Sequence, residues 1–390
     1  MTAPRPLLLH ISSDYPNPIR TPTTNAVERL VDRVTDCDHV VVSLQRISDP
    51  RRTYWRDLGI VNGRRLIAHG YFAPPLGIGM YGCQVRLARR IRAFLKEENI
   101  RPNIVHSHRF TFEGIAAWMV ARATAASLFF SVRGEVEKKV FATKPTYRPL
   151  FRKMARDAAS VFYVSAWYKT GFERHTGIDP AKTHLLPNIV FNTRRTIATV
   201  APKPRFLIAM TLAAIDKKGL PELLAAFASI RSELEGISLE IIGDGPPGTR
   251  ERVDALIAEN RLGDRIVARG ALPHDTLLEE LPTALAMVMP SHNETFGMAF
   301  VEALFAGTPI LYGAETGIDG YLDGLDVGVA VTPGDEKGIA RGLLRLAREN
   351  DRLRHNISEG AAILHERLDA DITVARYRAA IAAAMETRPA

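Results

Sequence analysis

Short apolar runs alternate with helical patterns along most of the chain, and this alternation is its main structural signal. In the first half the strand-like runs are Leu7–Ile11, Val40–Leu44, Ile104–Ser107, Leu128–Val132 and Val161–Val164. Helical patterns, such as those over residues 26–34 and 114–125, lie between several of them. Apolar strands that alternate with helices indicate a parallel sheet covered by helices on both faces.

The alternation stops near residues 187–204, where Asn, Thr, Arg and Pro cluster, so we expect an interdomain linker there. Strand-like runs then return at Phe206–Met210, Leu239–Ile242, Ile266–Val267, Ala286–Met289, Ile310–Leu311 and Val329–Val331. The sequence therefore predicts an α/β protein of two Rossmann-like, doubly wound domains, residues 1–195 and 196–368. A final helix in 369–390 could pack back on the N-terminal domain. If the carboxyl ends of the two sheets face each other, they form a cleft for ligands.

The densest group of chemically useful residues lies just after the run that ends at Pro290. Glu294 falls in a polar turn, and Glu302 falls about two turns into the helix that follows. Backbone N–H groups at a helix start favour phosphate, and the residues that would supply this start are Phe296, Gly297, Met298 and Ala299. One carboxylate near such an anion site can accept hydroxyl groups of a sugar, and the other those of a ribose. The spacing alone is weak, because Glu251 and Glu259 share it.

Charge is distributed unevenly along the 390 residues, which carry a net charge of +8. Residues 1–200 hold 31 Lys and Arg against 15 Asp and Glu, whereas residues 201–390 hold 20 against 28. A basic half favours an anionic partner. Residues 86–96 read as a basic amphipathic helix, with arginines at 86, 89, 90 and 92 on one broad face and Leu87, Ile91 and Leu95 on another. We expect this helix to bind an anionic membrane surface or a phosphate-bearing acceptor. The alternative is that its arginines only solvate an ordinary surface helix.

Other partner classes are disfavoured by composition. The chain shows no zinc-finger spacing and no RNP-like motif, so a nucleic-acid partner is not expected. Its two cysteines, Cys37 and Cys83, have no metal-ligand spacing, which predicts neither a metal site nor a disulfide framework. We expect a cytoplasmic protein that can associate with the inner face of the membrane.

A series of short motifs, in a characteristic order, resembles glycosyltransferase family 4 across nearly the whole chain. Glu294 and Glu302 match the glutamate–seven–glutamate signature of that family. The other landmarks are His106-Ser-His108, Arg133-Gly-Glu135, Ser165, Leu186-Pro-Asn188, Lys218-Gly219, Ile242-Gly-Asp-Gly245 and Val288-Met-Pro-Ser291. The resemblance implies a GT-B type fold and no metal or cofactor. It also implies transfer of a sugar from a nucleotide-sugar donor with retention of anomeric configuration.

The resemblance also suggests roles for individual residues. It places Glu294 on the donor sugar, Glu302 on the ribose and Lys218 on the diphosphate. A lysine makes physical sense there, because without a metal a cation must offset the charge that develops on the leaving diphosphate. Gly243 and Asp244 follow a strand and could let the nucleotide base approach the backbone, or they could form only a turn.

Three positions depart from the family pattern. Thr211 stands where an arginine is usual, so a bidentate phosphate contact is lost. The first N-terminal loop, usually rich in glycine, reads Thr21-Pro-Thr-Thr-Asn25-Ala26, and its hydroxyls and the Asn25 amide could still face a phosphate. Arg133 replaces a usual histidine and could clamp a diphosphate or an anionic acceptor, or form a structural ion pair with Glu135 or Glu137.

Two other classes of function compete with a transferase. The first is a GT-B type enzyme of different chemistry, such as a sugar-nucleotide epimerase. The second is a non-catalytic protein that binds sugar nucleotides, a reading that Thr211 and the missing glycines favour. A nicotinamide dehydrogenase is disfavoured, because no Gly-x-Gly-x-x-Gly follows the first strand-like run. We therefore expect transfer to a saccharide or lipid-linked acceptor, in the synthesis of cell-surface polysaccharide or glycolipid.

Overall fold

The computed structural model describes residues 5–19, 24–190 and 200–387. The chain divides into two compact units. The N-terminal unit comprises Met1–Val164, Tyr168–Ile189 and Asp371–Ala390, and the C-terminal unit comprises Ser165–Trp167 and Val190–Ala370. The change from one unit to the other at residues 189 and 190 falls within the stretch where the sequence predicts a linker, most of which lies outside the described residues.

Eight strands of the described N-terminal unit form one sheet in the order β3-β4-β2-β1-β5-β6-β7-β8. All neighbours are parallel except β3 and β4, which form an antiparallel hairpin at the edge. The strands are β1 Leu7–Ser12, β2 Asp38–Ile47, β3 Tyr54–Val61, β4 Arg64–Phe72, β5 Ile104–Ser107, β6 Ser127–Val132, β7 Ser160–Tyr163 and β8 Thr183–Leu185. Strand order reverses between β1 and β5, and ligands of doubly wound sheets bind beyond the carboxyl ends of strands at such a point.

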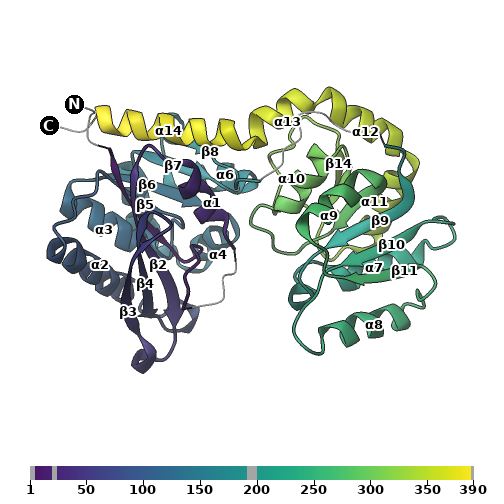
Figure 1. Ribbon diagram of the computed structural model, residues 1–390, viewed down its shortest axis with the longest axis horizontal. Helices are drawn as coiled ribbons and strands as arrows, with labels where there is room; N and C mark the ends of the chain where they lie inside the picture. Colours follow the sequence, from purple (N-terminus) through teal and green to yellow (C-terminus); the bar gives the residue numbers. More distant parts are fainter. Residues whose placement is uncertain (1–4, 20–23, 191–199, 388–390) are drawn as a thin grey trace. The chain divides into compact units, whose positions relative to one another are not determined.

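The helices of this unit are α1 Ala26–Arg33, α2 Met80–Glu97, α3 Gly114–Thr124, α4 Glu135–Thr143, α5 Arg148–Asp157, α6 Lys169–Thr176 and the terminal α14 Ala370–Glu386 (Figure 1). α14 packs on the N-terminal sheet, where Tyr377 contacts His106, and its Arg378 bonds Asp36 at 2.9 Å. None of the helices in the described ranges combines the length and apolar character that a membrane-spanning segment needs.

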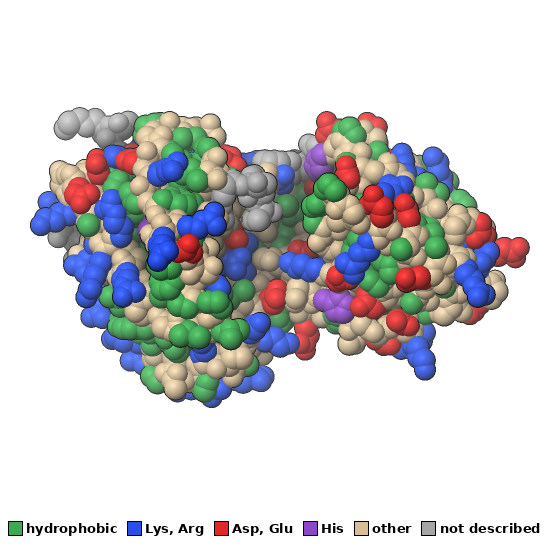
Figure 2. Space-filling view, turned by 90° about the horizontal axis from the view of Figure 1, so that it is seen from below, with side chains coloured by type: hydrophobic (Ala, Val, Ile, Leu, Met, Phe, Trp, Pro, Cys, Tyr) green, Lys and Arg blue, Asp and Glu red, His purple; other side chains and the backbone are tan. Residues whose placement is uncertain are grey.

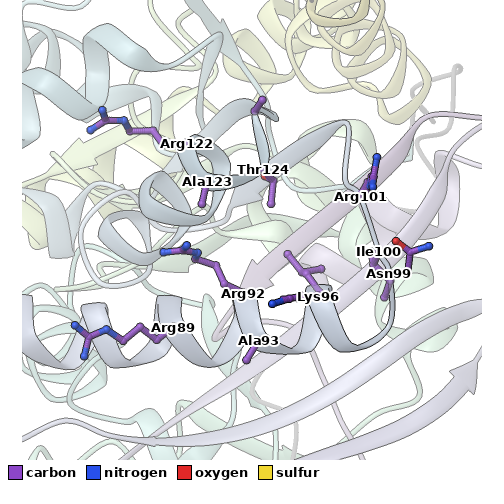
Figure 3. A pocket seen from close by; sticks show the side chains of 12 residues that line it. Arg89, Arg92, Ala93, Lys96, Asn99, Ile100, Arg101, Arg122, Ala123 and Thr124 are labelled. Atoms are coloured by element: carbon purple, nitrogen blue, oxygen red, sulfur yellow. The ribbon is translucent and has the colours of Figure 1, made fainter.

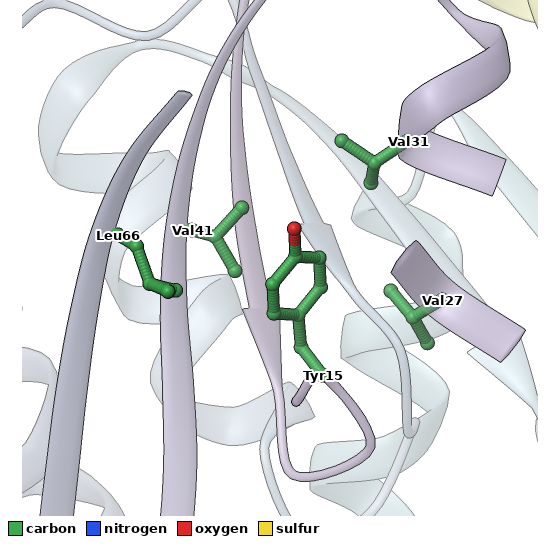
Figure 4. Close-up of a cluster of buried hydrophobic side chains, with 5 residues drawn as sticks. All are labelled: Tyr15, Val27, Val31, Val41 and Leu66. Carbon is green, nitrogen blue, oxygen red and sulfur yellow. The ribbon is translucent and has the colours of Figure 1, made fainter. Parts of the chain in front are cut away.

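Apolar side chains fix α1 against the sheet. Tyr15 packs among Val27 and Val31 of α1, Val41 of β2 and Leu66 of β4, and all five side chains are buried (Figure 4). Burial of each such side chain contributes about 1.5–3 kcal/mol. The Tyr15 hydroxyl accepts a hydrogen bond of 2.9 Å from the Arg64 guanidinium, so the polar end of the ring is satisfied inside the cluster.

Six parallel strands of the described C-terminal unit form a second sheet in the order β11-β10-β9-β12-β13-β14. They are β9 Lys203–Ala209, β10 Ser238–Ile242, β11 Ile266–Gly270, β12 Ala284–Met289, β13 Ile310–Gly313 and β14 Gly328–Val331. The helices are α7 Leu220–Ser229, α8 Thr249–Glu259, α9 His274–Glu280, α10 Met298–Phe305, α11 Glu336–Arg348, α12 Asn350–Glu359 and α13 Ala361–Leu368. Numbered from β9, this order is the 3-2-1-4-5-6 order of the Rossmann fold.

The predicted fold class is confirmed, because both units are α/β with parallel, Rossmann-like sheets. The β3–β4 hairpin was not predicted. Its sequence signal is Asn62-Gly63, which turns the chain with positive φ values of 49° and 77° and is the strongest short-range hairpin signal. The strand pattern of β3 is hard to recognise in the sequence, because charged Arg56 and Asp57 interrupt the alternation of apolar and polar residues. Such charges are tolerated in an exposed edge strand.

Candidate active site

The reversal of strand order in the C-terminal sheet brings two loops together. It lies between β9 and β12, which are adjacent and parallel. The loop after β9 leads to Lys218 and Gly219, and the loop after β12 leads to Glu294. The two loops bond directly, because the backbone N–H of His292 donates to the carbonyl of Lys217 at 2.9 Å.

Gly219 is required at this junction. Its φ of 71° lies in the left-handed region, and a Cβ at this position would overlap the carbonyl oxygen of Pro290. Only a residue without a side chain lets α7 begin so close to the end of β12. The motif Lys218-Gly219 therefore has a physical reason, since the glycine allows the approach that brings the lysine beside the second loop.

Lys218 and Glu294 form an ion pair between the two loops, and less than a fifth of either side chain is exposed. Glu294 is held by its surroundings as well. Its backbone N–H donates to the Thr316 hydroxyl at 2.6 Å, and its carbonyl accepts from the Gly317 N–H at 2.8 Å. The two residues that the sequence singles out for sugar and diphosphate thus meet across the switch point of the sheet.

Glu302 lies on α10 with its side chain 8% exposed, and its carboxylate contacts Nε2 of His274 at 2.9 Å. His274 begins α9, and almost half of its side chain is exposed. The histidine ring offers one N–H to the carboxylate, which leaves other lone pairs of the carboxylate for a ligand hydroxyl. His274 was not predicted as a site residue. Its pairing with Glu302 could not be read from residues so far apart in sequence.

The start of α10 follows Glu294 directly. Gly297 is its N-cap in a left-handed conformation without a side-chain cap. Met298 and Ala299 are half-buried, whereas the Phe296 ring is buried edge-on against Tyr321 at a centroid distance of 5.5 Å. The Phe296 side chain therefore belongs to the core, and only its backbone remains available to a ligand.

A second histidine, His292, was also missed, although it falls inside the motif that contains Glu294. Its Nε2 contacts the Glu222 carboxylate in the first turn of α7 at 2.9 Å. This contact adds a further link between the loop after β12 and the helix that carries Lys218 and Gly219 at its start.

Gly243 and Asp244 lie at the neighbouring strand end, after β10. Gly243 has a φ of 148°, and a Cβ there would overlap the carbonyl of Met210. The glycine therefore allows the loops after β9 and β10 to touch, as the Leu212 N–H does by donating to the Asp244 carbonyl at 2.9 Å. Thr211 is exposed and caps a short 3₁₀ turn, Leu212–Ala214.

At the carboxyl ends of the N-terminal strands lies a buried group of charges. Arg109 makes a two-pronged salt bridge to Asp14, with distances of 2.9 and 2.8 Å. Arg133 follows β6, is 6% exposed and points its Nε to Asp14 at 3.2 Å and to the His108 carbonyl at 3.1 Å. Arg133 thus forms an ion pair with Asp14, and Glu137 accepts its backbone N–H at 3.1 Å.

Asn25 lies in the loop that follows β1 and is the exposed N-cap residue of α1. Its side chain makes no cap hydrogen bond, whereas its carbonyl accepts from the Arg29 N–H at 2.9 Å. The residues 20–23 of the same loop lie outside the described residues.

Glu113 lies in the same buried group and is fully enclosed. One of its oxygens accepts from the Ser13 N–H at 2.5 Å, and the other has no hydrogen-bond partner. Burial, with the nearby Asp14 charge, raises the pKa of Glu113 from 4.5 to about 7. This carboxyl was not predicted from the sequence, because a lone glutamate before a helical pattern carries no signal of burial.

A chain of histidines lies beneath this edge. His39 Nε2 contacts the Val34 carbonyl at 2.7 Å, His39 Nδ1 contacts His10 Nε2 at 3.0 Å, and His10 Nδ1 contacts His108 Nε2 at 3.0 Å. A carbonyl only accepts, so when all three rings are neutral each donates through Nε2, and His39 and His10 accept through Nδ1. Burial lowers the pKa of all three histidines, and this keeps them neutral.

His106 completes the group, with Tyr377 and Ser131 as hydrogen-bond partners at 2.7 and 2.9 Å. Burial lowers its pKa to about 3. Ring nitrogens of His10, His106 and His108 lie within 4.8 Å of one another. Because the hydrogen bonds already occupy both nitrogens of His10 and of His106, the cluster is satisfied as a polar core.

Both halves of the chain match known protein families. Residues 20–189 match the glycosyl transferase 4-like domain, and residues 194–363 match glycosyl transferases group 1. A glycogen synthase of Mycobacterium tuberculosis is 24% identical over 368 residues, which cover 85% of this chain and 84% of that protein.

Solved structures share the fold. Sucrose-phosphate synthase from Thermosynechococcus elongatus superposes with a TM-score of 0.70 at 19% identity, covering 97% of this chain and 100% of that one. Anabaena HepE in complex with UDP-glucose gives a TM-score of 0.63 at 15% identity, covering 96% and 98%. Together with the two family matches and the paired glutamates after β12, these likenesses show that the chain belongs to the family 4 glycosyltransferases of GT-B fold.

Proposed function

We propose that the protein transfers a sugar from a nucleoside diphosphate sugar to a saccharide or lipid-linked acceptor, with retention of anomeric configuration and without a metal. The observation that carries this proposal is the Lys218–Glu294 ion pair at the switch point of the C-terminal sheet, beside the start of α10. A cation, a helix start and a carboxylate together suit a diphosphate joined to a sugar.

Each residue then has a distinct task. The diphosphate accepts hydrogen bonds at the start of α10 and from Lys218, whose charge offsets that of the leaving group as the bond to the anomeric carbon breaks. Glu294 accepts hydroxyls of the sugar. Glu302, already buried and held by His274, accepts hydroxyls of the ribose. The acceptor oxygen bonds the anomeric carbon, and its proton leaves with the released diphosphate.

Residues that border the donor receive lesser roles in the proposal. Gly243, Asp244 and Thr211 lie on the loops beside Lys218, where a nucleotide base and ribose would be bound. Arg133 and Asn25 of the N-terminal unit are proposed to bind anionic groups of the substrates, because both lie at the carboxyl edge of their sheet. Substitution of Arg133 or Asn25 by alanine tests these roles, and we expect each variant to bind its substrate more weakly.

Substitution of Lys218 by alanine tests the chemical step. Removal of a preorganised charge from the transition state lowers kcat about a hundredfold or more. The assay measures release of nucleoside diphosphate from UDP-, GDP- and ADP-sugars with an acceptor mixture, and Lys337→Ala, an exposed lysine of the same unit, serves as the control. We expect EDTA to leave the wild-type rate unchanged. A requirement for Mg²⁺ or Mn²⁺, or equal rates for Lys218→Ala and wild type, would refute the proposed role.

The same assay separates the competing functions. An epimerase would convert the sugar nucleotide without an acceptor, and a non-catalytic binding protein would form a complex that releases no product. Transfer that depends on acceptor excludes both.

We also propose that the N-terminal unit attaches to an anionic membrane to reach a lipid-linked acceptor. Three apolar residues are exposed, Leu76 at 84% and Ile78 at 64% just before α2, and Tyr81 at 46% in its first turn; α2 then continues with exposed Arg86. On the face shown in Figure 2, Lys and Arg gather over the N-terminal unit, whereas Asp and Glu are more frequent on the C-terminal unit. Apolar insertion combined with basic charge is typical of interfacial binding.

Co-sedimentation with vesicles tests this attachment. Binding to phosphatidylglycerol vesicles should exceed binding to phosphatidylcholine vesicles and weaken at about 0.5 M salt through screening. The double variant Leu76→Ser/Ile78→Ser should bind less, whereas Ile60→Ser, an exposed apolar residue on the β3 edge, should not change. Equal binding to both vesicle types, or none, would contradict the attachment.

A further inference from the structure

A groove lined by basic side chains lies between α2 and α3 of the N-terminal unit. It is open to solvent and has a volume of about 820 Å³, and its cationic lining residues are Arg89, Arg92, Lys96, Arg101 and Arg122. Figure 3 shows three of them along α2, with Arg122 on α3 and Arg101 in the segment that follows α2. No acidic side chain contributes to the lining. The volume is that of a small-molecule site.

The cations of this groove lack acidic partners. Among the residues that the structure describes, none of the five forms an ion pair, although two glutamates end α2 nearby. Those glutamates are engaged elsewhere, Glu97 by Arg90 at 3.5 Å and Glu98 by Arg65 at 2.8 Å. Arg90 itself lies over the Trp55 ring at 4.1 Å, and it is not among the residues that line the groove.

Stabilisation of the helix ends explains the positions of only some of the five cations that line the groove. Lys96 and Arg122 lie in the last turns of α2 and α3, where a cation complements the helix dipole. Arg89 and Arg92 lie one to two turns before the end of α2, and Arg101 lies beyond the helix. Like charges gathered around one hollow repel one another, and a bound anion relieves that repulsion.

The groove is separate from the proposed transfer site. Arg101 precedes β5, and Arg122 precedes β6, so the groove lies at the amino ends of these strands. Asp14, Arg109 and Arg133 lie at the opposite, carboxyl edge of the same sheet, where substrates of such sheets bind. A ligand in the groove therefore has no direct contact with the residues that the proposed reaction uses.

We propose that this groove is a second binding site, which takes a ligand with two or more phosphate groups. Guanidinium groups bind phosphate bidentately, and four of the five cations are arginines. The concave shape suits a discrete polyphosphorylated group that enters it, which could be a soluble sugar phosphate or nucleotide, or the headgroup of a phosphorylated lipid. This site does not depend on the proposed transfer reaction.

Calorimetric titration with inorganic tripolyphosphate tests the site in the full chain. The titration uses a Lys218→Ala background, so that the proposed diphosphate site does not contribute. We expect the triple variant Arg92→Ser/Lys96→Ser/Arg101→Ser to raise the Kd for tripolyphosphate at least about tenfold, the loss of one charge-assisted hydrogen bond or more. The control Arg51→Ser/Arg52→Ser/Lys139→Ser removes the same net charge from exposed positions elsewhere in this unit. Equal weakening by both triple variants, or no change in either, would overturn the proposal.

Vesicle experiments identify the source of the phosphate. If a lipid headgroup is the ligand, vesicles that contain a lipid with phosphorylated inositol bind the protein, and tripolyphosphate displaces it. If the ligand is soluble, tripolyphosphate binds in calorimetry but does not displace the protein from those vesicles. Both results support a phosphate site in the groove. Absence of any tripolyphosphate binding in the Lys218→Ala background contradicts it, even if the transfer reaction is established.

Discussion

Replacement of Glu113 by glutamine should remove one pH-dependent contribution to the protein's stability. Glu113 is fully enclosed, and one of its carboxyl oxygens has no hydrogen-bond partner. Glutamine has the same shape, and its amide oxygen can accept from the Ser13 N–H as the carboxylate does. The substitution therefore removes an ionisable group and leaves the packing in place.

The magnitude follows from the pKa of Glu113, which is 4.5 in the unfolded chain and about 7 in the folded protein. Below pH 4.5 both states hold the proton. Between pH 4.5 and 7 the folded protein keeps a proton that the unfolded chain has lost, so this contribution to stability declines as pH rises, and above pH 7 it is gone. One pKa unit corresponds to about 1.4 kcal/mol, so the loss amounts to roughly 3 kcal/mol.

Thermal unfolding at pH 5 and pH 8 measures this loss. The Tm of Glu113→Gln relative to wild type should be several degrees more favourable at pH 8 than at pH 5, because about 1 kcal/mol shifts Tm by roughly 2–4 °C in a unit of this size. Glu135→Gln, an exposed glutamate on α4, should show no such difference. If the difference between Glu113→Gln and wild type is the same at both pH values, Glu113 is not held protonated by burial.

The junction at Gly219 and the buried histidines give further predictions. Gly219→Ala should weaken donor binding and destabilise the C-terminal unit by about 2 kcal/mol or more, because its left-handed φ and the Pro290 carbonyl leave no room for a Cβ. Gly236→Ala, with a φ of 75° and open space around it, should cost only the conformational strain, and equal effects of the two in denaturant titrations would refute the steric argument. As pH falls below 6.5, histidines of the unfolded chain become protonated. In the folded protein His106 is buried, its pKa is about 3, and it stays neutral. Stability should therefore fall by about 1.4 kcal/mol per pH unit for each such histidine. A Tm of the Glu113→Gln variant, which lacks the opposing Glu113 contribution, that stays constant from pH 7.5 to pH 5 would contradict this.

The sequence predicts the two α/β units well because buried parallel strands are continuous apolar runs. Such runs as Val40–Leu44 and Phe206–Met210 stand out against polar surroundings; the first falls in β2 and the second in β9, apart from Met210, which follows that strand. The β3–β4 hairpin was missed for the opposite reason. It lies at the sheet edge, where charged residues are tolerated, and only its Asn62-Gly63 turn signals it.

Individual site residues were predicted more easily than their contacts. Lys218 and Glu294 were identified by local motifs, but their ion pair joins loops 76 residues apart in sequence. The pairing of Glu302 with His274 and the burial of Glu113 likewise depend on which strands become neighbours. The basic groove shows the same limit, because the amphipathic pattern of residues 86–96 indicates α2, whereas Arg122 joins it only through the packing of α2 on α3.

Donor binding to the C-terminal unit tests the central claim most directly. Calorimetric titration of the wild type with UDP-, GDP- and ADP-sugars identifies the donor, and the same titration is then repeated with Glu302→Ala. We expect this variant to raise the donor Kd at least about tenfold, since it loses hydrogen bonds from a buried carboxylate to the ribose. Glu251→Ala, an exposed glutamate on α8, should bind the donor as the wild type does. Unchanged donor affinity in Glu302→Ala, or no binding of any sugar nucleotide by the wild type, would contradict a nucleotide-sugar site at the carboxyl ends of β9 and β12.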